Sequence, residues 1–116
     1  MLARKFRLRL KNDFKKVFEL GKFYPEKFLA IKILSNGSDV PRFGFIVSKK
    51  VSKKATVRNK IKRRLRESVR LKIKSGLIKD GFDAIVLTRP EIAAKNFAEI
   101  DEAMNKLLKK ARVLKN

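Results

Sequence analysis

The clearest alternation of apolar and polar positions lies near the end of the chain. Between residues 96 and 111, apolar side chains recur every three or four positions, which is typical of a helix with one buried face. These positions are Phe97, Ile100, Met104, Leu107, Leu108 and Ala111. We therefore predict a helix from about Asn96 to Ala111.

Two earlier segments also have helical spacing. Residues 53–75 carry an apolar side chain at every fourth position and end near Gly76, a residue that commonly closes helices. The apolar positions of this segment are Val57, Ile61, Leu65 and Val69. A shorter helix is predicted from about Asn12 to Leu20, where Phe14, Val17 and Phe18 share one face.

Three runs are strand-like. "KFLAIKIL" (27–34) and "RFGFIVS" (42–48) flank a turn-forming segment with Asn36-Gly37 and Pro41, which predicts an antiparallel pair. "DAIVLT" (83–88) is apolar almost throughout, as expected for a central strand. The order of helices and strands predicts one α+β domain over residues 1–116 with a single sheet. Residues 1–10 are expected to form a flexible segment.

The charge balance indicates what kind of partner the protein binds. The chain has 32 Lys and Arg against 11 Asp and Glu, a net charge of +21, although 44% of its residues are apolar. Repulsion at this level destabilises a compact state, so a polyanion is expected to neutralise it. Nucleic acid and an anionic membrane surface are the two obvious candidates. Because the sequence offers neither a membrane span nor an apolar signal-peptide core, we favour nucleic acid and expect a cytoplasmic protein without membrane partners.

The chemistry available to the protein itself is limited. The chain has no Cys and no His, which removes thiolate chemistry, the usual general base and the commonest metal ligands. Its carboxylates lack calcium-loop spacing, so no metal site is expected in the protein. Those considered were Asp13, Glu19, Asp39, Asp80 and Asp83.

The polar side of the 53–75 helix is where the positive charge concentrates. On a helical wheel Asn59, Arg63, Arg66 and Arg70 fall together opposite the apolar stripe, in a row roughly 16 Å long. Planar guanidinium groups suit phosphate oxygens, so the row indicates a phosphate-binding face. The alternative is a merely solvated face. Such faces usually alternate Glu with Lys, whereas here only Glu67 offers an opposite charge within the row.

The segment "FGFIVSKKVSKKATVRNKIKRRLRESVR" (43–70) resembles the signature of the bacterial ribonuclease P protein component. That signature has a strand, Ser-Lys-Lys, a short loop, Arg-Asn-Arg-Ile-Lys-Arg and a downstream Arg-Glu pair. "RLKNDFKKVFELGK", "GFDAIVLTRP" and the stripe from Phe97 to Leu108 resemble the family's opening helix, last strand and closing helix. Lys60 stands where the family most often has a second Arg, which keeps the charge but loses the bidentate geometry.

The resemblance implies a fold and a function. The family order is α-β-β-β-α-β-α around one mostly antiparallel sheet, with a left-handed crossover through the basic helix and a short strand at Lys22 to Tyr24. Its members are the protein subunit of a ribonucleoprotein endonuclease that removes the 5′ leader from precursor tRNA. The catalytic centre lies in the RNA with its magnesium, so the protein has no catalytic residues. The implied partners are the catalytic RNA and precursor tRNA, with no obligate protein partner.

The resemblance also implies two binding surfaces. The basic helix would dock on the catalytic RNA through Arg58, Asn59, Lys60, Lys62, Arg63, Arg66 and Arg70. A cleft between the opening helix and the sheet would hold the single-stranded leader through Phe14, Phe18, Lys32, Lys49, Lys50 and Arg89. Phe14 and Phe18 have an alternative role as core residues. Lys32 stands where some members have an aromatic residue, which makes stacking at that point doubtful.

Two other classes of protein share this composition. A ribosomal or other structural RNA-binding protein would also be small and basic, but it would need no leader cleft. A stand-alone nuclease would cleave RNA in a metal-dependent way without an RNA subunit. Footprinting on ribosomal RNA and on ribonuclease P RNA would distinguish the first class from a ribonuclease P protein.

Overall fold

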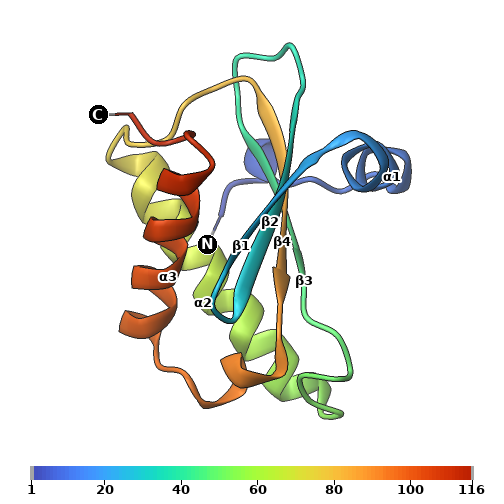
Figure 1. Ribbon diagram of the computed structural model, residues 1–116, viewed down its shortest axis with the longest axis vertical. Coiled ribbons are helices and arrows are strands. Elements are labelled where there is room, and N and C mark those ends of the chain that lie inside the picture. The colour runs from blue at the N-terminus through green and yellow to red at the C-terminus, as the bar shows by residue number, and fades with distance from the viewer. Residues whose placement is uncertain (1, 116) are drawn as a thin grey trace.

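The order of helices and strands follows the prediction from the sequence and its resemblance. The computed structural model describes residues 2–115. Its elements are a 3-10 turn η1 (Arg4–Phe6), α1 (Lys11–Leu20), β1 (Lys22–Glu26), β2 (Leu29–Ser35), β3 (Arg42–Ile46), α2 (Ala55–Lys74), β4 (Phe82–Thr88), a 3-10 turn η2 (Pro90–Ala94) and α3 (Phe97–Lys110). Figure 1 shows α2 and α3 on one side of the sheet and α1 on the other. The α+β class and the order α-β-β-β-α-β-α are confirmed, including the extra strand β1.

The sheet corrects one prediction made from the pattern of residues. Its strand order is β1-β2-β4-β3, so β2 and β3 are not neighbours. β4 lies between them, antiparallel to β2 and parallel to β3, while β1 pairs antiparallel with β2. The turn after β2 reverses the chain, but it does not place the next strand alongside. The first five residues of β4 are buried, because this strand has a neighbour at each edge and helices over both faces.

The predicted phases of α2 and α3 are confirmed. Asn96 caps α3, because its side chain accepts from the Glu99 N–H at 2.9 Å while the Glu99 side chain accepts from the Asn96 N–H at 3.1 Å. α3 buries Ile100, Ala103, Met104, Leu107 and Leu108, and α2 buries Ile61, Leu65, Ser68, Val69 and Lys72. Across residues 2–115, no helix is long and apolar enough to cross a membrane.

A buried polar cluster joins α2 to α3. The Lys72 ammonium, on a residue that is 7% exposed, donates to Asp101 Oδ1 at 2.5 Å. The Ser68 hydroxyl donates to the same oxygen at 2.6 Å. Burial raises the pKa of Asp101, but the hydrogen bonds from Lys72 and Ser68 outweigh that effect and lower it overall. The cluster fixes the two helices against each other.

The beginning of the chain differs from the expected flexible segment. Leu2 is 1% exposed and Leu8 is 4% exposed. The Leu8 N–H donates to the Phe43 carbonyl at 2.8 Å, and Arg7 forms a parallel bridge with Phe43. The prediction is therefore wrong for residues 2–10, which pack along the edge of β3, while Met1 lies outside the described residues. Apolar residues isolated among arginines gave no periodic signal that this segment is anchored.

Candidate nucleic-acid interface

The seven predicted contacts of the basic helix, which we call the cationic row, lie on the side of α2 away from the core. Asn59, Lys60 and Arg63 are exposed, and the remaining members are half-buried: Arg58, Lys62, Arg66 and Arg70. In the described part of the chain, no carboxylate forms an ion pair with Lys60, Lys62, Arg63 or Arg66. These cations have no protein charge to neutralise them, which suits an external polyanion.

Two members of the row also have partners within the protein. Arg70 makes a bidentate pair with Glu67, with Nε to Oε1 at 2.8 Å and Nη2 to Oε2 at 2.7 Å. Hydrogen bonding to Arg70 lowers the pKa of Glu67, and the same pair raises the pKa of Arg70. Arg58 donates to the backbone carbonyls of Ser52 and Lys53 at 2.9 and 3.0 Å. Arg58 therefore also holds the loop that leads into α2.

The structure adds two arginines that the sequence did not single out. Arg7, Arg9 and Arg66 line a pocket of about 270 Å³ together with Phe14, Phe43, Gly44 and Phe45. Burial, and then repulsion from Arg7, lowers the pKa of Arg66. Converging cations of this kind favour a phosphate group. Leu8 is buried with an arginine on each side of it, but nothing in the sequence shows that this segment reaches the basic helix.

The opposite side of the sheet is only partly covered. α1 lies near one end of this face, as Figure 1 shows. Cross-strand register places Lys32 beside Ile85, which in turn lies beside Gly44, and α1 covers this row. The next row along the strands contains Ala30, Leu87 and Ile46. Leu87 and Ile46 are only half-buried, so an apolar surface extends from beneath α1 toward the far end of the sheet.

Phe14 and Phe18 project from α1 in different environments. Phe14 is half-buried, and its ring lies so close to Gly44 that a Cβ at that position would collide with it. Phe18 is 38% exposed, so it is not a fully buried core residue. The Lys32 ammonium donates to the Phe18 carbonyl at 2.7 Å and lies 5.5 Å from the centre of the Phe18 ring. The structure thus brings Phe18 and Lys32 together between α1 and β2.

An arginine fastens α1 to the sheet. Arg42 in β3 makes two hydrogen bonds to Asp83 in β4, at 2.8 and 2.7 Å, and a third to Asp13 in α1 at 3.3 Å. Hydrogen bonding to Asp83 is the main cause that raises the pKa of Arg42. Two of the carboxylates considered as metal ligands are therefore engaged with a guanidinium. Within residues 2–115 no three acidic side chains gather in a way that would hold a metal ion.

The remaining predicted cleft residues lie at one end of the sheet. β3 and β4 are parallel and their pairing ends at Ile46 and Leu87, so the carboxyl ends of both strands lie at the same end of the sheet. Lys49 and Lys50 follow β3, and Arg89 follows β4. All three are exposed, and the Arg89 N–H donates to the Phe28 carbonyl at 2.9 Å. The partly covered apolar row of Ala30, Leu87 and Ile46 thus leads toward positively charged residues.

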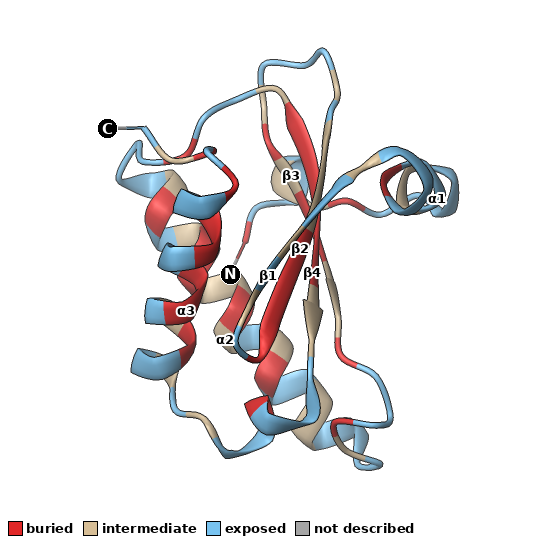
Figure 2. Ribbon diagram, viewed as in Figure 1, coloured by how far each residue is buried: buried red, intermediate tan, exposed pale blue. Residues whose placement is uncertain are grey.

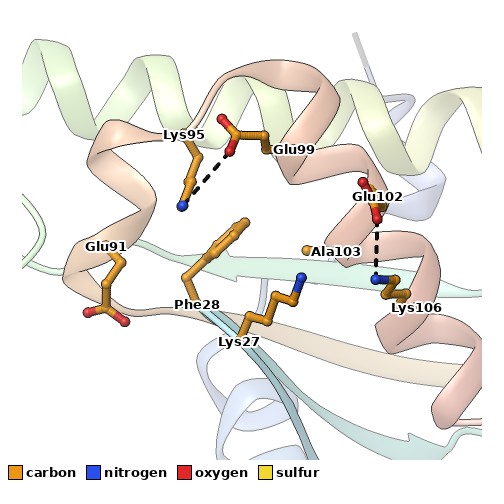
Figure 3. Close-up of a pocket in the computed structure, with 8 residues that line it drawn as sticks. All are labelled: Lys27, Phe28, Glu91, Lys95, Glu99, Glu102, Ala103 and Lys106. Carbon is orange, nitrogen blue, oxygen red and sulfur yellow. Dashed lines mark ion pairs between the residues drawn. The ribbon is translucent and has the colours of Figure 1, made fainter.

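A pocket on the α3 side has a different character. It measures about 360 Å³, and Figure 3 shows Phe28 among three lysines and three glutamates. Lys95 pairs with Glu99 at 3.8 Å, and Lys106 pairs with Glu102 at 3.2 Å. Its carboxylates make this pocket a poor site for phosphate. None of the predicted site residues lies in it.

Comparisons with known proteins identify the family of this chain. The family model described as Ribonuclease P matches residues 2–112. A ribonuclease P protein component of Alkaliphilus oremlandii is 41% identical over 108 residues, covering 93% of this chain and 92% of the relative. One from Clostridioides difficile is 39% identical over 106 residues, covering 91% of each chain.

Solved structures show the same fold. The RNase P protein of Staphylococcus aureus has a TM-score of 0.84 at 29% identity, covering 95% of this chain and 98% of the other. The RNase P protein of Thermotoga maritima has a TM-score of 0.80 at 36% identity, covering 90% and 96%. Sequence and overall structure therefore agree that the chain belongs to the ribonuclease P protein family.

Proposed function

We propose that this protein is the protein subunit of the ribonucleoprotein ribonuclease P, and that it assists endonucleolytic removal of the 5′ leader from precursor tRNA. Membership of the family implies a role in an endoribonuclease complex. The observation that carries the finer proposal is the presence of two different surfaces suited to RNA. One is the cationic row of α2, in which Lys60, Lys62, Arg63 and Arg66 have no carboxylate partner among residues 2–115, and the other is the half-covered apolar face beneath α1.

The cationic row would bind the catalytic RNA. Lys60, Lys62, Arg63 and Arg66 have no carboxylate partner among residues 2–115, so phosphates would neutralise them. The other predicted contacts are Arg58, Asn59 and Arg70. Arg70 keeps Glu67 as a neighbour, so we expect it to contribute less than Arg63 or Arg66.

The half-covered face would bind the leader. Phe14 and Phe18 offer ring faces on which unpaired bases can stack, a contact worth about 1–3 kcal/mol per base. Lys32, Lys49, Lys50 and Arg89 would neutralise leader phosphates along the same path. Stacking depends little on base identity, so this cleft suits leaders of varied sequence.

The reaction chemistry would belong to the RNA. We propose that magnesium is held mainly by the RNA subunit, since Asp13 and Asp83 are engaged with Arg42 and do not fit a metal cage. The protein would contribute positioning and charge, with no catalytic side chain and no obligate protein partner. The cytoplasm is the proposed compartment, because the RNA partners would be there.

Reconstitution with a bacterial ribonuclease P RNA tests this function. At low magnesium, cleavage of precursor tRNA by the RNA alone is compared with cleavage after the protein is added. We expect a clear rise in cleavage, and a smaller rise with Arg63→Ala when protein is limiting. An unchanged rate, together with specific footprints on ribosomal RNA, would show that the protein is a structural RNA-binding protein of another kind.

A further inference from the structure

We propose that Phe23 in β1 is a third aromatic platform of the leader site and extends that site to the free edge of the sheet. This inference rests on the proposed function. β1 pairs with β2 so that Phe23 lies directly opposite Lys32. Paired residues point to the same face, so Phe23 lies on the face that carries α1. It is 50% exposed, more than Phe18 at 38%.

Phe23 completes a row across all four strands. The register places Gly44, Ile85, Lys32 and Phe23 side by side, in the strand order β3, β4, β2 and β1. Neighbouring strands lie about 4.8 Å apart, so the row is roughly 14 Å long. The Phe14 ring covers Gly44 at one end, and Phe18 lies against Lys32. Aromatic side chains therefore occur at both ends of the row and between them.

Lys32 supplies the charge that such a row needs. Its ammonium is tied to the Phe18 carbonyl and lies 5.5 Å from the centre of the Phe18 ring, and its backbone lies opposite Phe23. In residues 2–115 no carboxylate pairs with Lys32. Two bases stacked on Phe18 and Phe23 would place a connecting phosphate near this ammonium. The lysine thus has a specific role at the position where some family members have an aromatic residue.

Phe23 has little role in the fold. On β1 the core is filled by Tyr24, whose side chain points to the other face and packs against the main cluster. An exposed phenylalanine on an edge strand favours unwanted pairing with other chains, which makes it costly without a function. Leu20 is also exposed, at 68%, but belongs to neither core cluster and has no partner in the row. Leu20→Ala is therefore a matched control.

The test uses the reconstituted ribonucleoprotein and precursor tRNAs whose leaders lengthen one nucleotide at a time. With Phe23→Ala we expect about a 5- to 150-fold loss of affinity for long leaders, the range for one stacked base. Leaders of one or two nucleotides should bind as they do to wild type. Phe23→Tyr should retain the affinity, Phe23→Leu should lose it, and Leu20→Ala should match wild type. An abasic leader position that removes the Phe23→Ala effect would identify the stacked nucleotide.

The outcomes separate this inference from the proposed function. If the wild type binds long and short leaders with equal affinity, and Phe18→Ala does the same, the proposal that the protein has a leader site is wrong. If wild type prefers long leaders but Phe23→Ala matches it at every length, only the role of Phe23 is overturned. The free protein can also be tested for self-association. If Phe23→Ala abolishes self-association but leaves leader affinity unchanged, Phe23 forms a contact between two copies of the protein, and its role in the leader site is overturned. Circular dichroism and thermal melting establish that each variant is folded.

Discussion

The two faces of the sheet have opposite relations to solvent. On one face α2 and α3 seal a continuous core that includes Leu29, Ile31, Phe43, Ala84 and Val86. On the other face α1 covers a small cluster of Leu8, Val17 and Ile85, and leaves Phe18 and Phe23 partly exposed. Figure 2 shows the buried residues gathered on the strands and on the inward sides of α2 and α3.

The difference separates stability from binding. Residues on the sealed face are fixed by packing, so a change there costs folding energy. Residues on the open face keep apolar and aromatic surface in contact with water, which is unfavourable unless a ligand covers it. The arginine tie from Arg42 to Asp13 and Asp83 holds α1 over its part of the open face. Mutations on the two faces should therefore differ in kind.

The largest expected effect is on the sealed face. Leu65→Ala removes a side chain that is fully buried in α2, and we expect it to lower the free energy of unfolding by about 2–5 kcal/mol. Leu71→Ala, on the same helix but 39% exposed, should change it by less than about 0.5 kcal/mol. Urea denaturation of both variants measures the difference. Equal losses would contradict the packing of α2 described above.

A smaller effect is expected where α2 and α3 join. Asp101→Asn leaves the buried Lys72 without its charged partner, so stability at neutral pH should fall by about 1–3 kcal/mol. Because folding lowers the pKa of Asp101 from its ordinary value of 3.8, its contribution is present above that value and is lost as the pH falls through the folded pKa. The difference in the free energy of unfolding between the wild type and Asp101→Asn should thus narrow below about pH 4.

Denaturation curves from pH 3 to 7 measure that gap. Glu102→Gln is the control, because its pair with Lys106 is exposed and should contribute about 0–1 kcal/mol. A gap that widens toward acid pH would mean that Asp101 is not stabilised as the carboxylate.

On the open face we expect a loss of binding rather than of fold. Phe18→Ala should weaken binding of precursor tRNA to the assembled enzyme by about 1–3 kcal/mol, because a base loses its stacking platform. Binding of mature tRNA, which has no leader, should change little. Titration of both tRNAs measures the difference, and an equal loss for both would place Phe18 outside the leader site.

Substitutions on the outer side of α2 should have the smallest effect on stability and should change the salt dependence of RNA binding instead. Affinity for RNA should fall by about three to five decades between 50 and 200 mM salt if six to ten phosphates are neutralised. Arg66→Ala should reduce the slope of log affinity against log salt by about one, with little change in stability. Lys109→Ala, on the exposed side of α3, is the control and should leave the slope unchanged. A nearly flat slope for wild type would remove polyanion binding.

The sequence predicted the helices of this fold better than its sheet. Helical phase depends on local spacing, so Leu65 and Arg66 are assigned to opposite sides of α2 from their positions alone. Strand pairing depends on distant segments, and the wrong pairing of β2 with β3 shows that limit. β1 contains a proline and two charged residues, so only the family resemblance indicated it.

The candidate site also contains residues that could be predicted from the sequence and residues that could not. The row on α2 follows from the wheel, and Phe14 and Phe18 follow from the resemblance. Arg7, Arg9 and Phe23 could not be selected, because their place depends on the edges of β3 and β2. Their own sequence neighbours give no indication of the long-range contacts that bring them to the site.

The insertion of β4 between β2 and β3 also has a kinetic consequence. During synthesis β2 and β3 leave the ribosome long before β4, joined by a turn that favours a hairpin between them. The native sheet forms only when β4 arrives and takes the place between the two strands. Closing such long loops is slow relative to local hairpin formation. We therefore expect the nascent chain to pass through a period in which a non-native hairpin of β2 and β3 competes with the native sheet.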